Sequence, residues 1–174
     1  MKILVLGDGF VGMNVYEYLS CFFDCYISNR KELDVTNLEQ VKNFFSTKQF
    51  THIVYACGNK NVANCSLKIP EAFSLNSLSI NNLKKILTNN IKFIYISSDY
   101  VYEGCKPFYM ETSPTFPQTI YGASKLAGEN ITRCLFENHA ILRTGGLFGK
   151  NCLWLNNLLN YNKSKGVFKC YGDI

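Results

Sequence analysis

The amino-acid sequence predicts an α/β protein with a doubly wound parallel sheet, in which helices cover both faces. Short apolar segments recur along the 174 residues, and stretches with helical periodicity separate them. A glycine-rich turn follows the first apolar segment directly. Strands that alternate with helices, joined by right-handed crossovers, give a sheet of this kind. The length suits one domain with a hydrophobic core of its own.

The predicted elements alternate in a regular order. Strands are expected at five apolar segments, residues 3–6, 25–27, 52–56, 93–97 and 140–143. Helices are expected at four segments, residues 11–21, 38–45, 70–87 and 121–136. Either Thr36 or Asn37 can cap the second helix. Gly104 and Pro107 mark a loop that continues to Pro117.

Composition and charge exclude several classes of protein. The chain is 47% hydrophobic and 18% charged, and its net charge of +5 comes without a basic run, so nucleic acid is not an expected partner. No apolar segment approaches the roughly 18–20 residues that span a membrane. The first apolar run is too short for the core of a secretory signal. We therefore expect a cytoplasmic protein without a membrane partner.

The eight cysteines predict neither a metal site nor a disulfide framework. No Cys-x-x-Cys occurs, and His52 and His139 are far from any pair of cysteines at ligand spacing. Because no export signal is recognised, the thiols are expected to be reduced and mostly buried.

A Gly-x-Gly-x-x-Gly motif stands between the first strand and the first helix. Gly7 allows a tight turn, Gly9 lets the backbone approach a pyrophosphate, and Gly12 lets the helix lie close to the strand. Phe10 and Val11 begin the helix, whose N-terminus presents free N–H groups to phosphate. The motif in this context predicts a Rossmann-like dinucleotide site, and a tight strand–helix turn without a ligand is the alternative.

The residue that selects the cofactor should follow the second strand. An acid at that place binds the 2′-hydroxyl of NAD, but the sequence has Ser28-Asn29-Arg30. Because a guanidinium can pair bidentately with a 2′-phosphate, Arg30 favours NADP, and NAD is the alternative. Asn29 and Arg30 are therefore candidate cofactor-binding residues.

Tyr121 and Lys125, one helical turn apart, are the candidate chemical pair. A reductase that delivers hydride to a carbonyl needs a proton donor at the oxygen, and a phenol with an ordinary pKa near ~10 is a weak acid–base group at neutral pH. A nearby cation lowers such a pKa. We expect Lys125 to lower the pKa of Tyr121 and to reach the nicotinamide ribose.

The Tyr-x-x-x-Lys spacing occurs three times, so the context of each pair decides between them. Tyr102 and Lys106 flank a glycine and run into a proline, which predicts a turn. Tyr161 and Lys165 lie in a polar stretch without an apolar face. Only the pair that starts at Tyr121 opens an amphipathic helix with small residues.

Two serines close the fourth strand and can supply the hydroxyl that polarises a carbonyl. Ser97 and Ser98 lie at the carboxyl edge of the predicted sheet, where doubly wound sheets bind ligands. Capping or turn formation is the alternative role for either one.

Together these motifs resemble the extended short-chain dehydrogenase/reductases, most closely the dTDP-4-dehydrorhamnose reductase group of nucleotide-sugar reductases. The resemblance covers nearly the whole chain. It rests on ISSDYVYEG at 96–104, Glu111-Thr112 ahead of Pro117, YGASKLAGE at 121–129, Leu142-Arg143-Thr144, and the spacing from Ala56 through Val62 to Asn76.

The resemblance implies a role for single residues. It makes Ser98 the hydroxyl that polarises the carbonyl, Tyr121 the proton donor, and Lys125 the group that tunes the pKa and holds the ribose. The other cofactor contacts that it implies are Asp34 and Val35 beside the adenine, and Ala56, Cys57 and Gly58 along the ribose and phosphates.

The sequence departs from the family's pattern in three respects. The glycine turn is one residue shorter than the usual Gly-x-x-Gly-x-x-Gly, and Ser98 stands where threonine is common. Members of the family are also longer, and their later part builds much of the substrate pocket. We therefore expect residues 1–150 to form the NAD(P)-binding Rossmann domain. Residues 151–174, with a strand-like segment at 167–170, are expected to be the truncated start of a substrate-binding part that is largely absent.

The leading functional hypothesis is NADP-dependent reduction of a 4-keto nucleotide sugar. One alternative is an NAD(P)-dependent epimerase or dehydratase of the same superfamily. Another is a non-catalytic, dinucleotide-binding regulatory subunit. A nucleotide sugar is the expected partner, and a homodimer is possible because relatives often dimerise.

Overall fold

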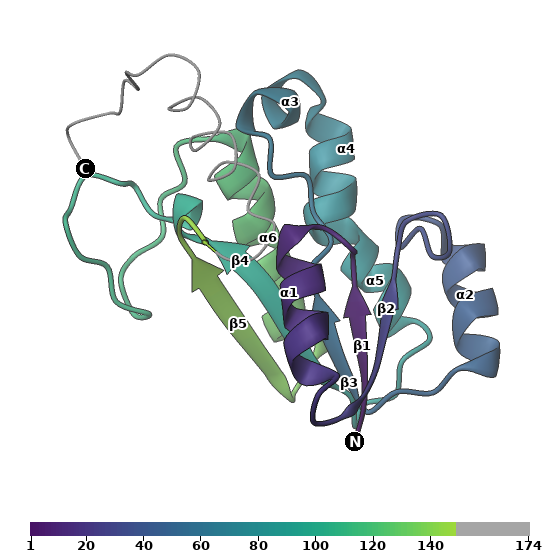
Figure 1. The fold of residues 1–174 in the computed structure, drawn as a ribbon. Coiled ribbons are helices and arrows are strands. Elements are labelled where there is room, and N and C mark those ends of the chain that lie inside the picture. The colour runs from purple at the N-terminus through teal and green to yellow at the C-terminus, as the bar shows by residue number, and fades with distance from the viewer. Residues whose placement is uncertain (149–174) are drawn as a thin grey trace, which may run out of the picture.

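The five apolar segments form one parallel sheet in the computed structural model, which describes residues 1–148 (Figure 1). Its order is β2-β1-β3-β4-β5, so the chain turns first to one side of β1 and then to the other. This arrangement confirms the predicted doubly wound sheet. The strands are β1 (Lys2–Leu6), β2 (Asp24–Ser28), β3 (His52–Tyr55), β4 (Lys92–Ser98) and β5 (His139–Thr144).

Alternate residues of β1 face the two layers of helices. Ile3 and Val5 belong to the apolar cluster under α1 (Phe10–Leu19), whereas Leu4 and Leu6 belong to the larger core on the other face. Figure 1 shows α1 alone in front of the sheet. The larger core is covered by α2 (Leu38–Thr47), α5 (Ser79–Lys84) and α6 (Ile120–Leu135).

The connection from β3 to β4 differs from the single helix predicted at 70–87. A short helix that was not predicted, α3 (Val62–Leu67), comes first, capped by the Asn61 side chain, which accepts from the Asn64 N–H at 2.8 Å. The helical stretch that follows is interrupted by a π-helical turn. It consists of α4 (Ile69–Phe73), the π turn η1 (Ser74–Leu78) and α5. Such a turn leaves no simple mark in hydrophobic periodicity.

Caps and turns settle two further sequence predictions. Asn37, not Thr36, caps α2, because its side chain accepts from the N–H groups of Glu39 and Gln40 at 3.0 and 3.2 Å. A short 3₁₀ turn, η2 (Asp99–Val101), follows β4 and leads into the loop. There Gly104 has φ +84°, which confirms the turn predicted between Tyr102 and Lys106.

The six cysteines within residues 1–148 are free thiols, but only Cys65 is buried. The expectation that they are mostly buried is therefore wrong, because Cys21 and Cys105 lie in turns and Cys134 on the outer side of α6. In this part of the chain no group of three metal-ligating side chains gathers, and no helix is long and apolar enough to cross a membrane. The pair at 161 and 165 and the segment 151–174 lie outside the described residues.

Candidate active site

A cavity of about 320 Å³ opens at the carboxyl ends of the strands, where the chain switches from one side of β1 to the other. Ligands of doubly wound sheets bind at this kind of switch point. The glycine turn, the segment after β3, the end of β4 and the start of α6 all contribute to its wall. The predicted site residues that line it are Gly9, Phe10, Val11, Ala56, Cys57, Gly58, Ser98, Tyr121 and Lys125.

Gly7 and Gly12 shape the glycine turn from behind the cavity. Gly7 has φ +102°, and its N–H donates to the carbonyl of Ser28 at 3.0 Å, which holds the turn against β2. A Cβ added to Gly12 would lie 1.8 Å from the carbonyl oxygen of Gly7, so only glycine lets the helix come this close. The two residues therefore support the site without forming its wall.

Gly9 is the member of the motif that faces open space. A Cβ built there meets no atom within 4 Å, and Gly9 is also the N-cap of α1 without a side-chain cap. The first helical hydrogen bond runs from Met13 N–H to the Gly9 carbonyl at 2.9 Å. The N–H groups that come before Met13 in the first turn of α1 thus have no acceptor within the helix and can bind an anion.

Ser98 and Tyr121 meet in the same cavity. Ser98 ends β4, where its hydroxyl donates to Asp99 Oδ1 at 3.0 Å and accepts from the Tyr100 N–H at 3.3 Å. Tyr121 lies in the first turn of α6, which the Thr119 side chain caps by accepting from the N–H of Gly122. The ring of Tyr121 meets that of Tyr100 edge to face, with 5.5 Å between centroids.

The pKa of Tyr121 is raised, which contradicts the expectation that Lys125 lowers it. Burial of the phenol raises the pKa, and a hydrogen bond with Ser98 opposes this only in part. Lys125 is itself only 4% exposed, and its Nζ lies 4.2 Å from the centroid of the Tyr95 ring. Burial lowers the pKa of Lys125 to about 7. At neutral pH the amine is therefore only partly protonated, and it favours a charged Tyr121 phenolate less than a fully charged lysine would.

The folded chain is expected to gain about 2 kcal/mol of stability between pH 7 and pH 9 because of Lys125. In the unfolded chain the amine keeps its ordinary pKa of 10.5 and stays protonated, whereas the folded amine loses its proton above about pH 7. Because the unfolded state binds more protons, rising pH favours folding in this range. Urea unfolding at pH 7, 8 and 9 measures the change. Lys125→Met should remove this gain in the free energy of unfolding, whereas Lys85→Met, at an exposed lysine, should keep it. An equal change of the free energy of unfolding with pH in both variants would contradict the prediction.

Asn76 holds two walls of the cavity together. The sequence did not predict this role, because there Asn76 only ended the spacing that begins at Ala56. It lies in the π turn, fully buried, and its side chain accepts from the Asn59 N–H at 2.7 Å and donates to Ser124 Oγ at 2.8 Å. Its carbonyl accepts from the Tyr95 hydroxyl at 2.5 Å. Asn59 follows Gly58, so Asn76 fixes the segment after β3 against α6. A buried asparagine in an otherwise helical apolar pattern is the signal that could have found it.

The remaining predicted cofactor residues lie outside this cavity. Arg30 lines a neighbouring cavity of about 720 Å³, which shares Gly58 with the first. The Nε of Arg30 donates to Asp34 Oδ2 at 3.0 Å. Burial raises the pKa of Asp34, but hydrogen bonds from Thr36 and Arg30 outweigh it and hold that pKa below its ordinary value.

Two of the predicted cofactor residues, Asn29 and Val35, have other local roles in the structure, and a third, Cys57, lies in the first cavity. The Asn29 side chain accepts from two backbone N–H groups of the turn after β2, at 2.9 and 3.0 Å. The side chain of Val35 is 2% exposed and packs in the larger core. Cys57 lines the first cavity, where burial raises the pKa of its thiol to about 12 and keeps it protonated.

Known proteins resemble this chain in sequence and in fold. The chain is 31% identical over 145 residues to a dTDP-4-dehydrorhamnose reductase of Aggregatibacter actinomycetemcomitans, which covers 82% of this chain and 49% of the relative. It is 35% identical over 100 residues to methionine adenosyltransferase 2 subunit beta of Xenopus laevis, which covers 56% of this chain and 30% of the relative. A crystal structure of dTDP-4-dehydrorhamnose reductase from Bacillus anthracis, in complex with NADP, matches with a TM-score of 0.84 and 29% identity, over 95% of this chain and 61% of that one.

These matches confirm the resemblance to dTDP-4-dehydrorhamnose reductases that the motifs predicted. The chain spans about half the length of the first of these relatives. The family model described as RmlD substrate binding domain matches residues 1–168. The chain therefore belongs to the family of the RmlD substrate binding domain.

Proposed function

We propose that the chain binds NADP(H) and carries the catalytic groups of a reductase that acts on a 4-keto nucleotide sugar. The observation that supports this most directly is the single cavity that brings Ser98, Tyr121 and Lys125 together with the glycine turn. Membership of the RmlD family and the NADP named for the Bacillus anthracis reductase agree with it. Because the chain spans only part of its relatives, activity and substrate are proposals for the protein as a whole.

The residues of the cavity fit a dinucleotide. The open space at Gly9 and the first N–H groups of α1, which have no acceptor within the helix, suit the pyrophosphate, and Arg30 in the neighbouring cavity suits a 2′-phosphate. Ala56, Cys57 and Gly58 would lie along the ribose and phosphates. The adenine would lie beside the backbone at 34–35, since the Val35 side chain is taken up by the core.

The chemistry divides between three side chains. Bound NADPH supplies the hydride for the carbonyl carbon. The phenol of Tyr121 is protonated at neutral pH, so it has a proton to donate to the carbonyl oxygen. Its raised pKa makes this transfer harder, and a charged Lys125 on the ribose would ease it. Ser98 lies beside that phenol, and its hydroxyl, once turned from Asp99 Oδ1 toward the substrate, would donate a hydrogen bond to the same oxygen and orient it. Lys125 binds the ribose through its Nζ, and a bound phosphate nearby would favour its charged form.

A dinucleotide-binding subunit without turnover is the second candidate. The 35% identity to a protein named as a subunit of methionine adenosyltransferase favours it. An epimerase or dehydratase of the same superfamily stays a prediction of the sequence alone. A cytoplasmic location, a homodimer and the domain division at 150/151 also stay predictions.

Titration of the chain with NADPH and NADH, followed by nucleotide fluorescence, tests the proposal. We expect NADPH to bind more tightly, and Arg30→Ala to weaken NADPH binding by about 10–100-fold while NADH binding changes little, because a charge-assisted contact to phosphate is lost. Lys31→Ala is the matched control next in sequence. Failure of both nucleotides to bind would refute the proposal.

A second step separates reductase from subunit. A dTDP-linked 4-keto sugar is added to the chain with NADPH, and oxidation of the nucleotide is followed by absorbance. Oxidation supports the reductase, whereas binding without oxidation supports the subunit.

A further inference from the structure

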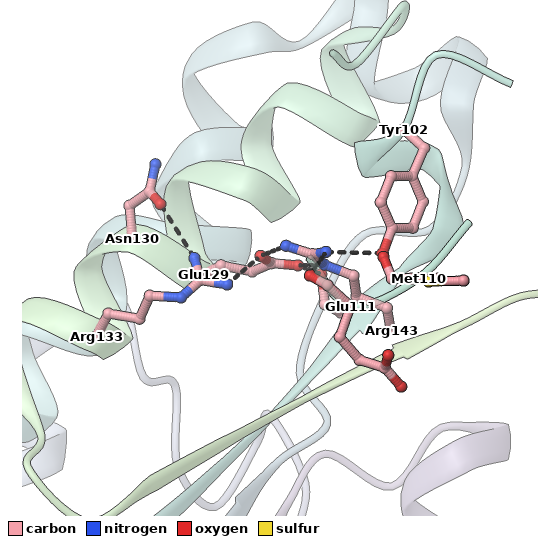
Figure 2. A network of polar contacts seen from close by, with 8 residues as sticks. Tyr102, Met110, Glu111, Glu129, Asn130, Arg133 and Arg143 are labelled. Atoms are coloured by element: carbon pink, nitrogen blue, oxygen red, sulfur yellow. Dashed lines mark hydrogen bonds and ion pairs between the residues drawn. The ribbon is translucent and has the colours of Figure 1, made fainter. Parts of the chain in front are cut away.

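Glu129 is a fully buried carboxylate with four donors around it. Its Oε1 accepts from Ser97 Oγ at 2.7 Å. The same atom accepts from Arg143 Nε at 2.9 Å, and Oε2 accepts from Arg143 Nη2 at 2.7 Å and Arg133 Nη2 at 3.0 Å (Figure 2). Burial raises the pKa of Glu129, but these hydrogen bonds outweigh it and keep the carboxylate charged. Because desolvation offsets much of the attraction in such a pair, its presence is poorly explained by stability alone.

The partners of Glu129 stand next to residues of the cavity. Glu129 lies one helical turn after Lys125 on α6. Ser97 immediately precedes Ser98 at the end of β4, and Arg143 immediately precedes the cavity residue Thr144 at the end of β5. One carboxylate therefore joins β4 and α6, which carry the proposed catalytic groups, to the end of β5.

Arg143 also reaches the segment that follows Ser98. Its Nη1 donates to the Tyr102 hydroxyl at 2.7 Å and to the Glu111 carbonyl at 3.2 Å, as Figure 2 shows. The Tyr102 hydroxyl in turn donates to the Met110 carbonyl at 2.9 Å. The stretch 98–101, which contains Ser98 and η2, is thus held at both ends. Its first end is tied through Ser97 to Glu129, and its second end through Tyr102 to Arg143.

We propose that the Glu129–Arg143 pair is a positioning device, which clamps the turn after β4 at both ends and so sets the Ser98 hydroxyl against Tyr121. The proposal rests on the reductase function proposed above, because it assigns Ser98 a place in that reaction. Arg133 contacts the same carboxylate but is 42% exposed, and its hydrogen bonds go to Glu129 and Asn130 on its own helix and not to the turn. It is therefore a natural control, since it shares the charge interaction and lacks the clamp.

Arg143→Gln and Arg133→Gln are compared by hydrogen exchange of the amides at 99–111, followed by mass spectrometry. We expect exchange in this segment to rise by about tenfold or more in Arg143→Gln and to stay unchanged in Arg133→Gln, because only the first releases an end of the turn. Arg143→Lys restores the charge but not the fork, so it should exchange as fast as Arg143→Gln. Equal exchange in Arg143→Gln and Arg133→Gln would overturn the proposal, as would full rescue by lysine.

The second readout is catalysis, with NADPH and a dTDP-linked 4-keto sugar. We expect Tyr102→Phe and Arg143→Lys to lower kcat by about 10–100-fold while the Kd for NADPH stays within twofold, because misplacement of a reacting group affects the chemical step. A parallel loss of NADPH affinity would point to general unfolding and would overturn the proposal. If the unsubstituted chain bound neither nucleotide, the proposed function alone would fail, because the exchange comparison needs no cofactor.

A double variant separates positioning from stability. Glu129→Gln with Arg143→Met removes both charges of the pair and leaves only Arg133, which is 42% exposed, without its carboxylate partner. It is therefore expected to unfold at a urea concentration close to that of the unsubstituted chain. Its segment 99–111 should still exchange as fast as in Arg143→Gln. Slow exchange in this double variant would show that the pair does not clamp the turn.

Discussion

Tyr121→Phe is expected to lower the turnover of a 4-keto nucleotide sugar by roughly 10²–10⁴-fold, the usual effect of losing a positioned proton donor. Phenylalanine keeps the ring and its edge-to-face contact with Tyr100, so the helix start should not move. The Kd for NADPH should change by less than about threefold, since the N–H groups at the glycine turn remain. Absorbance assays with saturating NADPH measure the rate of turnover, and fluorescence titration measures the Kd for NADPH.

Tyr161→Phe is the matched control for Tyr121→Phe. Tyr161 has a lysine at the same spacing, so an equal change tests whether the spacing or its context matters. It should leave the rate within twofold. Retention of full turnover in Tyr121→Phe, or its loss in Tyr161→Phe, would assign the proton donor to a different residue.

Gly12→Ala is expected to destabilise the fold by about 3 kcal/mol or more, at the upper end of the cost of overpacking. The new Cβ would stand 1.8 Å from the Gly7 carbonyl oxygen. Gly7 cannot move aside easily, because its N–H is hydrogen-bonded to the Ser28 carbonyl at 3.0 Å. Urea unfolding followed by circular dichroism measures the loss. Unchanged stability would mean that α1 can shift away from β1 at little cost.

Gly9→Ala provides the opposite result in the same motif. Its Cβ meets nothing within 4 Å, and Gly9 has φ −69°, which alanine adopts freely. Stability should therefore change by less than about 0.5 kcal/mol. NADPH affinity should nevertheless fall at least about tenfold, because the methyl group occupies the place where a pyrophosphate would approach the backbone. Together the two variants separate the structural glycine from the ligand-facing one.

Most of the fold was predictable because it depends on local pattern. The strands and the helices α1, α2 and α6 show in the alternation of apolar segments, and the glycine motif marked the turn between β1 and α1. Grouping of Ser98, Tyr121 and Lys125 also followed, since parallel strands bring their carboxyl ends to one edge. The roles assigned to these residues stay predictions.

The rest depends on partners that are distant in the sequence. Ser97 and Glu129 are 32 residues apart, and Arg143 and Tyr102 are 41 apart, so no spacing rule joins them. The pKa of Tyr121 was predicted in the wrong direction because pairwise charge reasoning omits burial, which here has the larger effect. Which of the two effects on a pKa is larger, charge or burial, can be judged only when the positions of the side chains are known.

The π turn has a consequence for which changes the helical stretch before β4 can tolerate. It contains one residue more than an α-helix needs for the same path, and each residue of an α-helix advances the chain by about 100° around its axis. Because of this extra residue, the stretch α4–η1–α5 directs Asn76 toward Ser124 and also buries Ile80 and Leu83 in the core. A single deletion between Ser74 and Leu78 would therefore rotate either Asn76 or the core residues out of place. The length of this stretch is as much a part of the site as the residues in it.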